Sequence, residues 1–223
     1  MIELNNLNEK EIKKLNIDDL THMFMDSINK QNLKLIEGIG FLIKEDFDNF
    51  TKNLNSVIQT KTEIQIKKAF EAKIFKSKLM FSKADRIKVF SKINDIKGIG
   101  EHLAHRMLLY KVVLPDEEFK LKIGLILKYL KGISINIADA VKTIGSDLER
   151  AHEICEHVKE ERRKMRGEEW SLLNRLWNYD VDYISRTWIY LKEFIEGIMM
   201  LADHIKSFAE YIQFLATKYF YFK

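Results

Sequence analysis

The stretch from 93 to 108 carries two glycines and an alanine in a spacing that could bind DNA. It reads INDIKGIGEHLAHRML, with Gly98, Gly100 and Ala104 at the positions that a helix-hairpin-helix motif requires. Such a motif holds the phosphate backbone with the amides of a glycine turn at the start of a helix. The chemistry therefore depends on a turn near Gly98.

The apolar pattern around these glycines favours one continuous helix instead. Apolar or small residues recur at alternating spacings of four and three residues: Val89, Ile93, Ile96, Gly100, Leu103, Met107 and Tyr110. A hairpin turn would change the phase of this face, and the phase is unbroken. A glycine on the apolar face costs about 1 kcal/mol of helix propensity but lets a neighbouring helix approach closely. We predict a continuous helix and keep a DNA-binding hairpin at 93–108 as the alternative.

Two other groups have the spacing of metal ligands on a helix. They are His102-x-x-His105 and Glu149-x-x-His152. A di-iron site in a helix bundle needs two Glu-x-x-His motifs and two further glutamates, and only one such motif is present. A solvated charged face is therefore favoured for both groups. Since the sequence also lacks a phosphate-binding glycine loop, a Cys-x-x-Cys pair and a nucleophile elbow, we do not predict an enzyme.

A basic segment extends from Lys67 to Lys92, in which nine basic residues stand against two acidic ones. Lys73, Lys76 and Lys78 lie in its middle. Clustered positive charge attracts phosphate-rich partners, acidic proteins and anionic membrane surfaces. We predict an anion-binding or partner-binding role for these three lysines, with a hydrated helix end and loop as the alternative.

The composition indicates that long helices position these groups. The chain has 223 residues with one proline and nine glycines, and 46% of its residues are apolar. So little proline suits helices better than a many-turned β fold. The one cysteine excludes an internal disulfide, and no apolar run is long enough for a membrane span or typical of a signal peptide. We therefore expect a cytoplasmic protein, whose net charge of +4 permits acidic partners.

Apolar periodicity predicts six helices. A heptad pattern from Ile184 to Tyr219 predicts one helix of roughly 40 residues. A second pattern runs from Ile123 to Leu148 and breaks at Gly145, after which Ser146 and Glu149 form a capping box for a helix over 147–175. Less regular patterns predict a helix from an N-cap at Asp18 or Asp19 to Lys44, and another from about Asp46 to Leu79.

Pro115 and Asp116 divide these helices into two sets of three. We predict an N-terminal extension at 1–17, a first half at 18–114 and a second half at 115–223, within one compact domain. A shift of 102 residues superimposes the apolar pattern of 93–110 on that of 195–212. The same shift pairs Glu101 with Asp203 and His102 with His204, which indicates a duplication.

Two segments, INDIKGIGEHLA and ADHIKSFAEYI, resemble sequence patterns of the PhoU-like phosphate transport regulators, in the branch often encoded beside low-affinity phosphate permeases. The family patterns read roughly L-D-D-I-x-D-x-x-E-x-x-A and E-x-x-x-D-x-x-x-x-x-A-E. The matching residues are Asp95, Ile96, Glu101, Ala104, Asp203, Ala209 and Glu210, while Asn94 and Gly98 stand where the family has acids.

The resemblance implies an all-α, PhoU-like six-helix architecture, in which two antiparallel three-helix bundles are related by duplication. It also implies a non-enzymatic regulatory or accessory protein of phosphate transport. The expected partner is a phosphate permease or another regulatory protein, with a homo-oligomer and a peripheral membrane contact as further possibilities. Nucleic acid is not an expected partner. A helical scaffold without a ligand is the remaining alternative.

The resemblance further implies a metal site. In the family, paired carboxylates on facing helices bind iron, zinc or similar cations, and this chain keeps part of that set in Glu156, Glu160 and Asp203. Oxygen donors of this kind suit Mg²⁺, Mn²⁺ or iron. Met199 replaces the acid four residues before Asp203, so the expected site is weak. In the first half Lys97 lies beside the corresponding acid and opposes metal binding.

Overall fold

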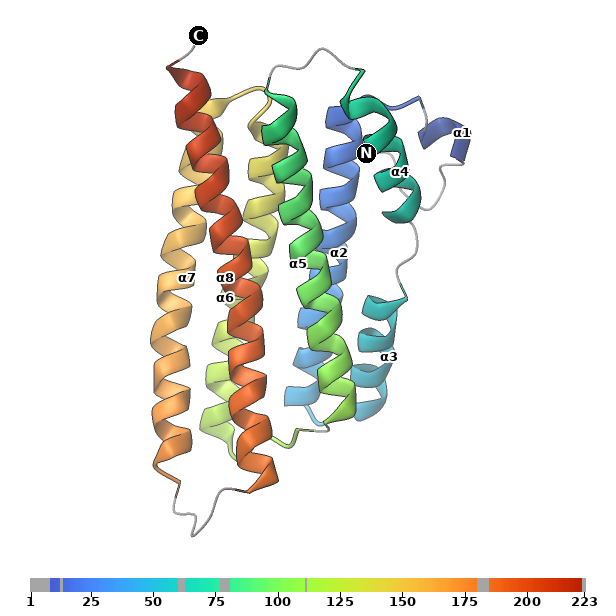
Figure 1. Ribbon diagram of the computed structural model, residues 1–223. Coiled ribbons are helices and arrows are strands. Elements are labelled where there is room, and N and C mark those ends of the chain that lie inside the picture. Colours follow the sequence, from blue (N-terminus) through green and yellow to red (C-terminus); the bar gives the residue numbers. More distant parts are fainter. Residues whose placement is uncertain are drawn as a thin grey trace.

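The computed structural model describes residues 9–12, 14–59, 63–76, 81–110, 112–179 and 185–221. Within these ranges the protein is all-α, as predicted, and its long helices lie side by side (Figure 1). The helices are α1 (Glu9–Ile12), α2 (Ile17–Ile43), α3 (Phe47–Ile58), α4 (Glu63–Ile74), α5 (Lys83–Leu109), α6 (Glu117–Thr143), α7 (Leu148–Trp177) and α8 (Arg186–Phe220).

Helix α2 begins two or three residues earlier than predicted. Its N-cap is Asn16, whose side-chain oxygen accepts a hydrogen bond from the amide of Asp19 at 2.8 Å. The Asp19 carboxylate accepts in return from the Asn16 amide at 3.4 Å, which completes a capping box. The prediction of Asp18 or Asp19 as the cap is therefore wrong, because Asp19 is the acidic partner at the third helical position and not the cap.

The helix predicted from about Asp46 to Leu79 is two helices. Asp46 does cap α3, but α3 ends at Ile58 and α4 covers Glu63–Ile74. Residues 60–62 and 77–80 lie outside the described ranges. The chain between the two helices reads QTKT, and β-branched threonines are weak helix formers. Both helices pack on α2.

Helix α7 begins one residue later than predicted. Asp147 is the N-cap and accepts from the Arg150 amide at 2.9 Å. The hydroxyl of Ser146 instead donates to the Thr143 carbonyl at 3.1 Å, at the end of α6. The proposed capping box between Ser146 and Glu149 is therefore wrong, since Ser146 belongs to the turn that ends the preceding helix.

One continuous apolar core joins all the long helices. Helices α6, α7 and α8 pack on one another, and α2 packs on α3, α4 and α5. Contacts of α2 with α6 and of α5 with α8 connect these two groups. Cys155 of α7 is fully buried in this core, and burial raises the pKa of its thiol to about 12.

Asp85, near the start of α5, fastens α5 to the last turns of α8. Its carboxylate accepts hydrogen bonds from Ser82 at 2.7 Å, Lys218 at 2.8 Å and Tyr211 at 3.1 Å, and from the hydroxyl of Tyr219. Burial alone would raise the pKa of Asp85, but these four donors outweigh it and hold the pKa well below its ordinary value.

Asp116 has a similar role at the opposite end of the helices. It caps α6 by accepting from the Phe119 amide at 2.8 Å. The same carboxylate accepts from Tyr179 at 2.6 Å and from Arg175 at 2.9 Å, which binds the start of α6 to the end of α7. The Tyr179 hydrogen bond, with those from Phe119 and Arg175, outweighs burial and lowers the pKa of Asp116 to about 2.

Candidate functional site

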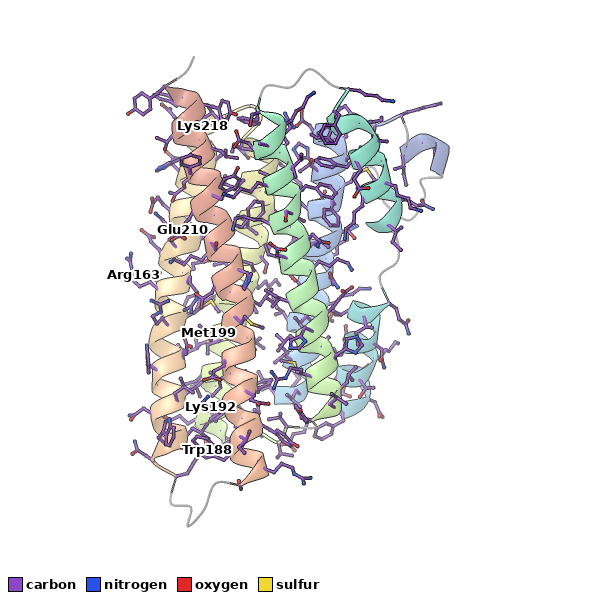
Figure 2. The ribbon with its side chains drawn as sticks, viewed as in Figure 1. Arg163, Trp188, Lys192, Met199, Glu210 and Lys218 are labelled. Atoms are coloured by element: carbon purple, nitrogen blue, oxygen red, sulfur yellow. The ribbon has the colours of Figure 1, made fainter. Side chains whose placement is uncertain are left out.

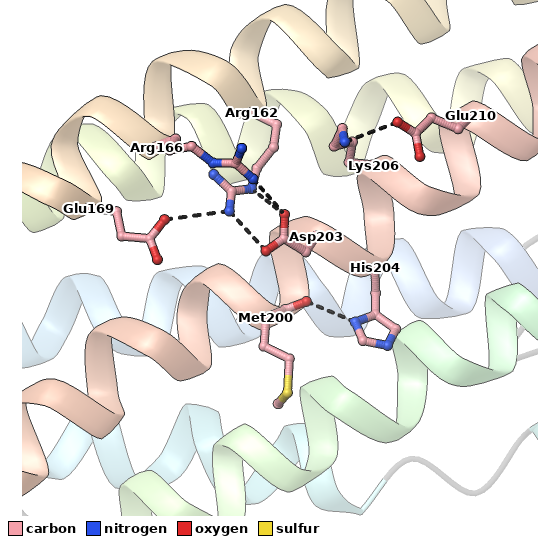
Figure 3. A network of polar contacts seen from close by, with 8 residues as sticks. All are labelled: Arg162, Arg166, Glu169, Met200, Asp203, His204, Lys206 and Glu210. Atoms are coloured by element: carbon pink, nitrogen blue, oxygen red, sulfur yellow. Dashed lines mark hydrogen bonds and ion pairs between the residues drawn. The ribbon is translucent and has the colours of Figure 1, made fainter.

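A cluster of four charged side chains lies between the middle of α7 and the middle of α8, around the buried Arg162. Arg162 reaches across from α7 to Asp203 of α8 (Figure 3). Its Nε and Nη2 donate to the two carboxylate oxygens of Asp203, each at 2.9 Å. This two-point geometry is the strongest form of an arginine–carboxylate contact.

Arg162 is a buried charge, because only 3% of its side chain is exposed. A buried charge is tolerated only when it is paired and hydrogen-bonded. Here Asp203 accepts two hydrogen bonds from Arg162. Glu169 of α7 makes a third contact, in which its Oε2 lies 3.5 Å from Nη2 of Arg162. The remaining nitrogen, Nη1, is buried and has no hydrogen-bond partner among the described residues.

Glu169 and Arg166 complete the cluster. Burial raises the pKa of Glu169, and the positive charge of Arg162 opposes that effect. Arg166 lies more openly, with its Nη2 3.9 Å from the same Asp203 carboxylate. The cluster therefore contains two carboxylates and two guanidinium groups, which balance in charge.

Glu156, a predicted metal ligand, is occupied by other donors. Lys159 donates to its carboxylate at 2.7 Å and Gln213 of α8 at 2.6 Å. The hydrogen bond from Lys159, followed by that from Gln213, lowers the pKa of Glu156. This glutamate therefore joins α7 to α8 through the amide of Gln213, while Lys159 binds it from its own helix.

Glu160 and Met199 do not join this group. Glu160 is exposed, and its nearest charged neighbour is His157, 3.7 Å away on the same helix. Met199 is buried in the apolar core, so it is a packing residue. Within the described residues, no group of three or more His, Cys, Asp or Glu side chains could hold a metal ion. The structure does not bring Glu156, Glu160 and Asp203 together as one ligand set.

The histidine motifs are also spread over the surface. His102 and His105 are exposed on α5. Glu149, His152 and Glu153 line a shallow hollow of about 330 Å³ between the start of α7 and the end of α8. This arrangement fits the solvated face that the sequence favoured.

Two lysines of the basic segment donate hydrogen bonds to backbone carbonyls of the same chain. Lys73 of α4 donates to the carbonyl of Leu15, which ties α4 to the residues before α2. Lys83 donates to the Phe75 carbonyl at 2.8 Å. Lys76 is exposed, and Lys78 lies outside the described residues. Of the three lysines predicted to bind an anion or a partner, Lys76 is thus the one with a described, exposed side chain.

The stretch 93–108 is helical throughout, as the apolar pattern predicts. Helix α5 passes through Gly98 and Gly100 without a turn. Gly100 faces α2, where an added Cβ would lie 3.3 Å from the Asn32 side-chain oxygen, so the glycine permits close approach of the two helices. The hairpin interpretation is wrong, and the DNA-binding alternative loses the motif on which it rests.

Arg162 was missed because the sequence around it reads as a solvated, highly charged helix. A signal was nevertheless present. The buried residues of α7 recur at spacings of three and four and include the arginine: Leu148, Ala151, Cys155, Val158, Arg162, Met165, Leu172 and Leu176. A charged residue in such a series predicts a buried ion pair with a neighbouring helix.

Two solved structures share this fold, although no family model matches the chain and no curated protein matches its sequence. One is a protein from Shewanella oneidensis MR-1 described as a PhoU-like phosphate regulatory protein; the other is described as a PhoU-like protein from the same organism. Each has a TM-score of 0.75 and 10% identity, over 91% of this chain and 100% of its own. The chain therefore has a PhoU-like fold.

Proposed function

We propose that this protein is a non-enzymatic regulatory or accessory protein of phosphate transport that acts in the cytoplasm by binding partner proteins. The fold shared with a PhoU-like phosphate regulatory protein over 91% of the chain is the observation that carries the proposal. The resemblance of the segments 93–104 and 202–212 to the PhoU-like patterns supports it independently. No helix among the described residues is long and apolar enough to cross a membrane.

The exposed side of α7 is the best candidate for the partner surface. Trp170 and Trp177 are 65% and 63% exposed and lie two helical turns apart, and the Trp177 ring packs edge-on against Trp188 of α8. Arg163 is exposed and points away from α8 (Figure 2), and Arg166 is exposed beside Asp203. Tryptophan and arginine are enriched where proteins bind one another. We call these four residues the α7 outer face.

The lysines of the basic segment supply a second, weaker candidate. Lys73, Lys76 and Lys78 remain part of the proposal as an anion-binding or partner-binding group. Since Lys73 already bonds to the Leu15 carbonyl, its replacement would also disturb α4. A test of this segment should therefore change Lys76 alone, with the exposed Lys131 of α6 as a control that carries the same charge change.

The duplicated organisation is also part of the proposal. The shift of 102 residues pairs α5 with α8, and these two helices pack against each other. In a protein built from two copies, equivalent helices of the copies would meet in this way. A weak internal repeat of this kind supports the PhoU-like assignment but does not identify the partner.

The direct test is retention of a phosphate permease, or of its cytoplasmic loops, by the immobilised protein. We expect the native protein to retain the permease, and Trp170→Ala to weaken retention by roughly tenfold, as for an interface hot spot. Phe214→Ala removes an aromatic side chain that is similarly exposed on α8, so it serves as the control and should bind normally. Thermal unfolding of both variants should match that of the native chain.

The two parts of the proposal fail separately. If the native protein retains no permease at low or physiological salt, partner-based phosphate regulation is wrong. If retention is normal in Trp170→Ala, the α7 outer face is not the contact surface. In that second case the function stands, and Lys76→Glu against Lys131→Glu tests the other surface.

A further inference from the structure

Arg162 binds the carboxylate that a metal ion between α7 and α8 would need. A cation shared between Asp203 and the acids of α7 must sit within about 2 Å of their carboxylate oxygens. The guanidinium group instead donates to both oxygens of Asp203, each at 2.9 Å (Figure 3). No carboxylate oxygen of Asp203 is left without a cationic donor.

The charges of the cluster are also balanced. Asp203 and Glu169 contribute two negative charges, while Arg162 and Arg166 contribute two positive ones. A divalent cation brought beside Asp203 would be repelled by the permanent charge of Arg162, whose side chain is 3% exposed and lies against that carboxylate.

The other predicted ligands cannot complete a coordination shell. The carboxylate of Glu156 is held by Lys159 at 2.7 Å and by Gln213 at 2.6 Å. Glu160 is exposed near His157, away from the cluster. Hard cations such as Mg²⁺ and Mn²⁺ need several oxygen ligands at once. The donor set that the sequence suggested therefore does not fit a metal.

We propose that Arg162 is the resident cation of the α7–α8 interface, standing where the sequence resemblance placed a metal ion. The side chain neutralises Asp203 and Glu169 and holds the two helices in register. The interface is thus complete without a metal, and its stability is independent of metal supply and of chelators. This inference does not depend on phosphate regulation, because it concerns only how α7 and α8 are held together.

The test compares the native chain with Arg162→Met and Arg163→Met. Both variants remove one arginine from neighbouring positions of α7, but Arg163 is exposed. We expect the Tm of the native protein to be the same in EDTA and in Mn²⁺. Arg162→Met should lower the Tm by about 10 °C, since it leaves two carboxylates of the interface without their cation. Arg163→Met should leave it unchanged.

Metal rescue gives the sharpest readout. In Arg162→Met the carboxylates of Asp203 and Glu169 lose the guanidinium group that they share, so a rise of its Tm in Mn²⁺ that the native chain does not show would support the exchange of arginine for a metal ion. If Arg162→Met does not fold, Arg162→Lys replaces it, because lysine keeps the charge but loses the two-point contact. The Tm of Arg162→Lys should be lower than the Tm of the native chain and lower than that of Arg163→Met.

Three results would overturn the proposal. They are a fall in the native Tm in EDTA, native Mn²⁺ binding that Asp203→Ala abolishes, and an Arg162→Met variant that is as stable as Arg163→Met. None of these results bears on permease retention, which tests the proposed function separately.

Discussion

At the scale of single residues, Asp85 shows how strongly one carboxylate can depend on its surroundings. Only 11% of its side chain is exposed, and four donors from α5 and α8 converge on it. Its pKa lies below the ordinary value of 3.8, so the charged form is favoured in the folded protein. Folding is therefore stabilised above about pH 4, and this contribution is lost as the pH falls further.

Asp85→Asn should make this dependence measurable. The amide has the same size but leaves the ammonium group of Lys218 without its partner, so the free energy of unfolding at pH 7 should fall by about 1 to 3 kcal/mol. At about pH 3 the difference between native and variant should be smaller, because the carboxylate becomes protonated in the unfolded chain and the advantage of the charged native form decreases. Urea unfolding at the two pH values measures both quantities.

Asp139→Asn is the matched control for this measurement. Asp139 is an exposed aspartate of α6, and its replacement should change the unfolding free energy by less than about 0.5 kcal/mol at either pH. An equal loss for Asp85→Asn at both pH values would show that the hydroxyl and ammonium donors do not favour the charged form.

Residue-scale contacts were the least predictable from the sequence. The apolar pattern of α7 contains Arg162, but it does not reveal which helix lies opposite. Asp203 is 41 residues away along the chain, and its selection as the partner follows from the antiparallel packing of α7 and α8. Asp85 and Lys218 are 133 residues apart, so their pairing likewise requires the fold.

At the scale of elements, the glycines of α5 and α8 differ in what surrounds them. At Gly98 of α5 an added Cβ would meet nothing within 4 Å, whereas at Gly197 of α8 it would lie 2.7 Å from a methyl carbon of Leu103. Leu103 is buried between the two helices, so its side chain must shift to admit the methyl group. The same substitution should therefore have opposite effects at the two positions.

We expect Gly98→Ala to raise the free energy of unfolding by up to about 1 kcal/mol, because alanine is the better helix former. Gly197→Ala should lower it by about 1 to 3 kcal/mol, because the methyl group forces α5 and α8 apart. Denaturant titration followed by circular dichroism gives both values. A loss of helicity in Gly98→Ala would contradict the continuous helix, and a stable Gly197→Ala would contradict the close packing at Leu103.

The long helices were predictable, while their ends were not. Apolar residues at unbroken spacings of four and three located α5, α6 and α8, because each of these helices buries one continuous face in the core. The caps at Asn16 and Asp147 were missed because several polar residues near each start could serve, and the choice depends on backbone geometry. The break between α3 and α4 was missed because the pattern there was already irregular.

At the scale of the whole molecule, the all-α architecture follows from composition and periodicity, and the PhoU-like fold is shared over nearly the full chain. The same fold is thus formed at 10% sequence identity. Within it, Arg162 and Asp203 make a contact between α7 and α8 that no short motif describes.

The buried thiol of Cys155 gives a way to measure how often the last three helices open. As the one cysteine of the chain, fully buried among α6, α7 and α8, it can react only when these helices separate. The rate of thiol modification therefore counts opening events. In native buffer we expect modification about a thousandfold slower than in urea, and faster in Arg162→Met than in Arg163→Met. Equal modification rates in native buffer and in urea would mean that the last three helices separate freely. The arginine cluster would then not hold α7 and α8 together.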